Sequence, residues 1–82
     1  MERRIGNNEF IFSGRLEIDY INEKYKLHLP KTDDYETLAG YILTLNKDFP
    51  KNGDEFTDCD FKIKVLQVKK PKINIVKITL NT

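Results

Sequence analysis

The spacing of hydrophobic residues changes along the chain from two to three or four, and then back to two. Residues 9–13 are mostly apolar and are followed by Gly14, which predicts a short strand and a turn. Residues 17–26 place acids before lysines, as suits the helix dipole, and Pro30 prevents this predicted helix from continuing. Its apolar face consists of Ile18, Ile21 and Tyr25. Residues 1–8 have no periodicity and are interpreted as a linker or a disordered end.

The central stretch, residues 34–54, is predicted to contain a second helix. Asp34 or Thr37 can cap its first turn, because either side chain can accept a hydrogen bond from backbone N–H groups that lack a helical partner. The apolar face consists of Leu38, Tyr41, Ile42 and Leu45. Gly40 costs a helix interior about 1 kcal/mol relative to alanine, so we expect another backbone to pass close to it.

Pro50 and Gly53 turn the chain out of this helix and into a series of strands. A short strand follows, and from Phe61 hydrophobic residues alternate with lysines, which is typical of a strand with one face in water. The alternation breaks in the second half of that strand, which predicts either a bulge or burial on both faces. A lysine-rich hairpin at residues 69–72 leads to the return strand, residues 73–80.

The predicted element order is therefore β-α-α-β-β-β. It indicates an α+β fold: a two-layer sandwich in which a mostly antiparallel sheet of about four strands is covered on one face by two helices. The chain has 82 residues, which suffices for one domain, placed here at residues 9–82. A chain of this size buries only about 60–65% of the surface that its unfolded form exposes, so the core should be thin.

The central stretch resembles a known family. Its residues fit the pattern y-x-T-l-a-G … i-P-x-x-G-D of the CorC/HlyC transporter-associated domain. The matching positions are Tyr35, Thr37, Leu38, Ala39, Gly40, Phe49, Pro50, Gly53 and Asp54. Residues 12–22 are similar to the family's opening and residues 61–80 to its closing strands, so the resemblance covers roughly residues 8–80. Thr37, Gly40, Pro50 and Gly53 are explained by capping, packing and turns, and they define the fold rather than a site.

The resemblance implies a non-enzymatic accessory domain at the cytosolic C-terminus of a bacterial membrane protein. Such proteins are linked to magnesium and cobalt efflux, and some are called hemolysins. The resemblance also implies a fold grouped with a flavin-binding domain and places the domain after a transmembrane domain and a pair of cystathionine-β-synthase domains. Those domains would be its partners, at the cytoplasmic side of the inner membrane, and no cofactor is predicted.

Composition excludes several other classes of protein. No apolar run approaches the roughly 20 residues that cross a bilayer, and the first residues are not a signal peptide, so we expect this piece to be soluble. The single cysteine, Cys59, cannot form an internal disulfide and lies between two acids that disfavour its thiolate. His28 has no ligand or catalytic partner near it in sequence. We interpret Cys59 as a small residue in a strand-to-strand turn and His28 as a partly exposed residue that leaves a helix.

An acidic group after the central helix is the candidate metal site. Asp54, Asp58 and Asp60 lie in and around a predicted turn, but they lack the alternating ligands, the glycine and the glutamate of an EF-hand loop. They are therefore weak candidates for a loose cation site. Turn formation explains them better, because Asp side chains bond to their own backbone in turns.

Positive charge is concentrated at the other end of the chain. Residues 1–60 carry 8 Lys and Arg against 13 Asp and Glu, whereas residues 61–82 carry 6 Lys and no acid. Lys62, Lys64 and Lys77 should share the wet face of the sheet. No aromatic follows Phe61, so a nucleic-acid surface is not favoured. These lysines are a solvated face, or an interaction surface for an acidic partner or an anionic membrane.

No Ser/His/Asp set, Cys/His pair or phosphate-binding glycine loop indicates catalysis. The functional prediction is an accessory domain that modulates transport through protein contacts, including a homodimer through an exposed strand edge. The alternative is a regulatory domain that senses a divalent cation, an adenine nucleotide or FAD. A free-standing small protein of unrelated function is the third hypothesis.

Overall fold

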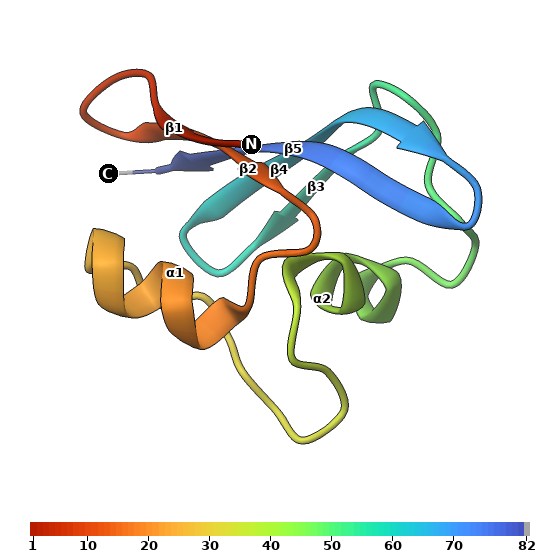
Figure 1. Ribbon diagram of the computed structural model, residues 1–82, viewed down its shortest axis with the longest axis horizontal. Coiled ribbons are helices and arrows are strands. Elements are labelled where there is room, and N and C mark those ends of the chain that lie inside the picture. Colours follow the sequence, from red (N-terminus) through yellow and green to blue (C-terminus); the bar gives the residue numbers. More distant parts are fainter. Residues whose placement is uncertain (82) are drawn as a thin grey trace.

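The computed structural model describes residues 1–81, and its centre is an antiparallel sheet of five strands in the order β1-β2-β5-β4-β3. The strands are β1 (Glu2–Arg4), β2 (Glu9–Ser13), β3 (Glu55–Asp58), β4 (Phe61–Lys69) and β5 (Lys72–Leu80). Both helices, α1 (Ile18–Tyr25) and α2 (Leu38–Leu45), lie on the same side of the sheet (Figure 1). The predicted α+β two-layer sandwich is confirmed, with one more strand than expected.

The additional strand corrects the interpretation of residues 1–8 as a linker or disordered end. Glu2–Arg4 forms β1 at one edge of the sheet, where Glu2 is opposite Phe12 and Arg4 is opposite Phe10. Periodicity could not reveal it, because three polar residues are too few to show an alternation. Side-chain contacts of Glu2 with α1 add to the few backbone hydrogen bonds of this short strand.

Helix α1 begins after Glu17 and ends at Tyr25, as its apolar spacing predicted. Ile18 and Ile21 are buried, and Lys26 takes the left-handed conformation that ends the helix. The Asn22 side chain then holds the departing chain, since it accepts from the backbone N–H of Leu29 at 2.9 Å and donates to the C=O of Leu29 at 3.0 Å.

Helix α2 is capped by Thr37, not by Asp34. The Thr37 hydroxyl accepts a hydrogen bond from the Gly40 backbone N–H at 3.1 Å. Three of the four predicted core residues of this helix, Leu38, Tyr41 and Ile42, are buried. Leu45 was wrongly predicted to be in the core: it is the last residue of the helix and is 36% exposed.

Two glycines, Gly40 and Gly14, have close neighbours, and these neighbours differ from the expected ones. A Cβ on Gly40 would lie 2.9 Å from the Cβ of Tyr35, so the neighbour is a side chain of the preceding loop rather than the backbone of another element. The closest backbone approach occurs at Gly14, which the sequence suggested was only a turn residue. A Cβ there would lie 2.2 Å from the carbonyl oxygen of Ile73 in β5.

Strands β4 and β5 form the centre of the sheet, and their pairing contains two irregularities. Val65 pairs with Val76, Gln67 with Ile75, and Val68 with Ile73. Each strand therefore inserts one extra residue, Leu66 in β4 and Asn74 in β5, and the second restores the register that the first shifts. The predicted bulge is confirmed.

The core lies between the helices and one face of the sheet. Its sheet-side residues alternate along the strands, as in a half-buried antiparallel sheet. The fully buried side chains include Phe12, Ile18, Ile21, Leu38, Tyr41, Ile42, Ile63, Val65, Val76 and Ile78.

Candidate interaction surfaces

The helix-free face of the sheet brings the three predicted lysines together. Lys62, Lys64 and Lys77 border a shallow cavity of about 220 Å³ with Thr79 and two glutamates. Lys64 lies opposite Lys77 in the register, so two positive charges are direct neighbours. The prediction that these lysines share one face is therefore confirmed, whereas their role as an interaction surface stays a prediction.

Two glutamates from neighbouring strands reduce the positive charge of this face. Lys62 forms an ion pair with Glu55 of β3 at 3.1 Å, and Lys77 forms one with Glu9 of β2 at 2.9 Å. Lys64 has no such partner within residues 1–81. The charge of the C-terminal segment alone was misleading, because an antiparallel sheet places acids from the first part of the chain beside these lysines.

The acidic residues after α2 take part in separate local contacts. Asp54 accepts a hydrogen bond from the Lys51 backbone N–H at 2.8 Å, which closes the turn that contains Gly53. Asp58 accepts one from the Tyr41 hydroxyl. In the described part of the chain, residues 1–81, no three His, Cys, Asp or Glu side chains form a group that could hold a metal ion.

The Tyr41–Asp58 contact connects α2 to the end of β3. Tyr41 is 2% exposed, and its burial, followed by the hydrogen bond to Asp58, raises its pKa well above the ordinary value. The phenol therefore stays protonated and donates to the carboxylate throughout the physiological range. Asp58 is thus a structural partner of the core tyrosine.

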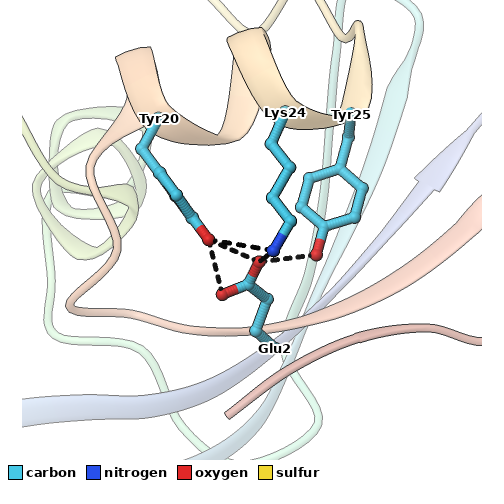
Figure 2. A network of polar contacts seen from close by, with 4 residues as sticks. All are labelled: Glu2, Tyr20, Lys24 and Tyr25. Atoms are coloured by element: carbon cyan, nitrogen blue, oxygen red, sulfur yellow. Dashed lines mark hydrogen bonds and ion pairs between the residues drawn. The ribbon is translucent and has the colours of Figure 1, made fainter.

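A polar cluster that the sequence did not suggest joins β1 to α1. The Glu2 carboxylate accepts hydrogen bonds from the hydroxyls of Tyr20 and Tyr25, each at 2.7 Å, and forms an ion pair with Lys24 Nζ at 2.6 Å (Figure 2). All three partners come from α1: Tyr20 and Lys24 are one helical turn apart, and Tyr25 directly follows Lys24. The Lys24 ammonium also lies 5.5 Å from the centroid of the Tyr20 ring and 5.6 Å from that of Tyr25.

This cluster favours the ionised form of the carboxyl group. The hydrogen bond from Lys24, followed by those from Tyr25 and Tyr20, lowers the pKa of Glu2 from 4.5 to about 2. The same contacts raise the pKa of Lys24 above its ordinary value. The Glu2 carboxylate is bonded to three side chains of α1, so we assign the cluster to the attachment of β1.

A larger cavity of about 540 Å³ lies where β2 leaves the sheet. It is bordered by Gly14 and Arg15 at that turn, by Leu43 of α2, and by the first residues of β5, Lys72 to Asn74. This volume is in the range of about 300–1,000 Å³ that is typical of ligand pockets. Sequence reasoning missed it, because its borders come from three separate parts of the chain.

The remaining candidates, His28 and Cys59, are exposed. His28 is exposed between the buried residues Leu27 and Leu29, as expected of a helix exit. Cys59 is an exposed free thiol in the turn between β3 and β4, with a φ of 53°. Among residues 1–81, no helix is long and apolar enough to span a bilayer.

The residues that suggested the family resemblance have the expected structural roles. Thr37 caps α2, Gly40 packs against Tyr35, and Pro50 is fully buried. Gly53 has a φ of +90°, which an L side chain rarely adopts. The family model of the CorC_HlyC transporter associated domain matches residues 3–82. The chain therefore belongs to the CorC_HlyC transporter-associated domain family, which is not a known class of enzymes.

Solved structures of similar fold support this assignment. A region associated with a putative Mg²⁺ and Co²⁺ transporter (CorC) of Neisseria meningitidis is 13% identical, with 96% of each chain covered and a TM-score of 0.84. A transporter associated domain of a CBS domain protein from Porphyromonas gingivalis is 22% identical over 99% of this chain and 98% of that one, with a TM-score of 0.82. No curated protein matches the sequence.

A third solved structure was determined with metal ions. It is the CorC_HlyC domain of a Xylella fastidiosa hemolysin in complex with Mg²⁺ and Mn²⁺, 18% identical over 99% of this chain and 98% of that one, with a TM-score of 0.82. At these identities the structures show the shared fold.

Proposed function

We propose that this chain is a regulatory accessory domain of a membrane ion transporter of the CorC type, which acts through protein contacts. The observation that carries the proposal is membership of the transporter-associated family along residues 3–82. The sheet offers two kinds of contact surface: the lysine face, Lys62, Lys64 and Lys77, and unpaired strand edges at β1 and β3. Neither requires a cofactor.

The proposed partners are the transmembrane and cystathionine-β-synthase domains of its own full-length chain, on the cytoplasmic side of the bacterial inner membrane. The solved domain from Porphyromonas gingivalis supports this arrangement, because it comes from a CBS domain protein. A second copy of the domain and the membrane surface are further proposed contacts of the open edges and of the lysine face. The domain is proposed to comprise the predicted residues 9–82 together with β1 (Glu2–Arg4), which pairs with β2 at the edge of the sheet.

The test is Mg²⁺ and Co²⁺ efflux by the full-length protein with and without residues 9–82. We expect the deletion to change the efflux rate while the membrane domain still inserts. Charge reversal of Lys64, which has no ion-pair partner among residues 1–81, should reproduce part of that change if the lysine face is the contact. Efflux unaffected by the deletion would refute the proposal.

A second candidate function is cation sensing, which the Mg²⁺ and Mn²⁺ complex of the Xylella fastidiosa relative favours. In this chain the candidate ligands would be Asp54, Asp58 and Asp60. The double variant Asp54→Asn with Asp58→Asn tests it, because amide shifts caused by Mg²⁺ at residues 54–60 should disappear while the domain stays folded. An unchanged response of those amides would exclude these carboxylates as ligands.

A further inference from the structure

We infer that the cavity beside the first residues of β5 binds an extended acidic peptide segment, which joins the sheet as an additional short strand. This inference rests on the proposed function, because it names the site and the partner chemistry of the protein contact. Three independent features of residues 1–81 lead to it: an open strand edge, an apolar wall and unpaired positive charge.

The open edge arises because β5 is longer than its neighbour β2. β5 begins at Lys72, but β2 pairs only with residues 75–79 and then turns away at Gly14 (Figure 1). Beyond the β2 pairing, the single backbone hydrogen bond from that side runs from the Gly14 N–H to the C=O of Asn74 at 3.2 Å. Gly14 covers the end of this edge, since it bonds to Asn74 and a Cβ on it would lie 2.2 Å from the Ile73 carbonyl oxygen. Beyond Gly14, the start of β5 at Lys72 and Ile73 has β4 on one side and the cavity on the other, which leaves room for a short added strand.

The adjoining cavity distinguishes this segment from the outer edges of β1 and β3. Leu43 of α2 is 42% exposed and borders the cavity together with Pro71 and the buried Ile73. Side chains of an added strand alternate between the two faces of the sheet. Every second residue of the peptide would therefore face α2, and the one beside Leu43 would be favoured to be apolar.

The other residues of the peptide, which point away from α2, would face positive charge. Ile73 is buried toward the helices, so its neighbour Lys72 points to the opposite side of the sheet. Neither Lys72 nor Arg15 has an ion-pair partner within residues 1–81, in contrast to Lys62 and Lys77. Lys69 and Lys70 of the adjacent hairpin add further positive charge. Acidic residues alternating with apolar ones complement both walls.

The probe is a seven-residue peptide of alternating Glu and Val with blocked ends, titrated into the ¹⁵N-labelled chain. We expect saturable amide shifts at residues 14–15, 43 and 72–74. Peptides of alternating Thr and Val, and of alternating Lys and Val, serve as controls and should bind at least about fivefold more weakly, as expected when favourable charge pairs are lost or reversed.

Two matched pairs of variants locate the contact. Lys72→Glu should weaken binding of the Glu/Val peptide at least about fivefold, whereas Lys64→Glu on the lysine face should leave it unchanged. Leu43→Asp should abolish binding, whereas Leu45→Asp, on the same helix and 36% exposed, should not. Both leucines are exposed enough for the variants to fold, and the amide spectrum without peptide verifies this.

Several results would overturn the inference. One is the absence of shifts at millimolar Glu/Val peptide, and another is equal binding of the Thr/Val peptide. Shifts confined to Lys62, Lys64 and Lys77 would move the contact to the lysine face and leave the proposed function intact. Signal loss at residues 43 and 69–72 with phosphatidylserine vesicles, without any peptide effect, would replace the peptide by a lipid surface. The proposed function is tested separately: efflux that is unaffected by deletion of the domain would refute it, whatever the peptide titration shows.

Discussion

Glu2 and Lys24 form an ion pair at 2.6 Å that connects the first strand of the sheet to the first helix. The Glu2 carboxylate also accepts hydrogen bonds from Tyr20 and Tyr25, so one side chain of β1 contacts three side chains of α1. Because β1 has only three residues, its place in the sheet depends on this contact as well as on its backbone pairing with β2. The N-terminal segment is thereby part of the folded domain.

Replacing this carboxylate should loosen β1 more than it unfolds the domain. In Glu2→Gln the amide keeps the size of the side chain but loses the charge that Lys24 pairs with. We expect a lower melting temperature and faster amide exchange at residues 2–4, with little change at β4 and β5. Glu9→Gln is the control, since Glu9 pairs with Lys77 on the open face. Equal exchange at β1 in the Glu2 variant and wild type would contradict the role given to the cluster.

The same carboxylate predicts a pH dependence of stability. Its pKa is lowered from 4.5 to about 2 in the folded chain, chiefly by Lys24, so folding favours the ionised form. Its contribution is therefore fully present above pH 4.5 and is lost as the pH falls toward 2. The difference in melting temperature between wild type and Glu2→Gln should be constant above pH 5 and should shrink below pH 4.5. A difference that stays constant down to pH 2 would contradict the lowered pKa.

The sequence revealed the parts of the fold that have a long enough pattern. Ile18 and Ile21 in α1, and the alternation that begins at Phe61, each continue over several residues and were placed correctly. β1 has no apolar residue, and Leu45 satisfied the helical spacing but is 36% exposed. Periodicity shows which side of an element is apolar, but the end of the partner surface depends on tertiary structure.

The surfaces were less predictable than the fold because they join distant segments. Lys62 and Lys77 were recognised as a basic face, but Glu9 and Glu55 become their neighbours only through strand pairing. The cavity beside β5 combines the turn at Gly14, helix α2 and the start of β5. A local reading of charge or of glycine position cannot bring such residues together.

Gly14 should be the glycine least tolerant of substitution. A Cβ there would lie 2.2 Å from the carbonyl oxygen of Ile73, so Gly14→Ala must push β2 away from β5, at a cost of about 1–3 kcal/mol in the free energy of unfolding. Gly6→Ala is the matched control, because the nearest atom to its Cβ would be a Glu9 side-chain oxygen at 3.8 Å. Urea unfolding of both variants measures the difference, and equal stability would show that the backbone contact is relaxed in solution.

Tyr41→Phe isolates the hydrogen bond between α2 and the end of β3. The ring stays in the core, so the loss is that of one hydrogen bond to a charged acceptor, about 1.5–3 kcal/mol in the free energy of unfolding. Burial, and then the bond to Asp58, raises the pKa of the Tyr41 phenol above its ordinary value of 10, so its stabilising effect is present below pH 10 and is lost as the pH rises further.

Wild type should therefore exceed Tyr41→Phe in stability at pH 7, and the difference should narrow above pH 10. Asp58→Asn separates charge from hydrogen bonding, because the amide oxygen can still accept from Tyr41 and should retain part of the stability. Urea unfolding at pH 7 and pH 11 measures both effects. If Tyr41→Phe were as stable as wild type at pH 7, the contact would contribute nothing to the attachment of α2, and hydrophobic burial alone would hold that helix on the sheet.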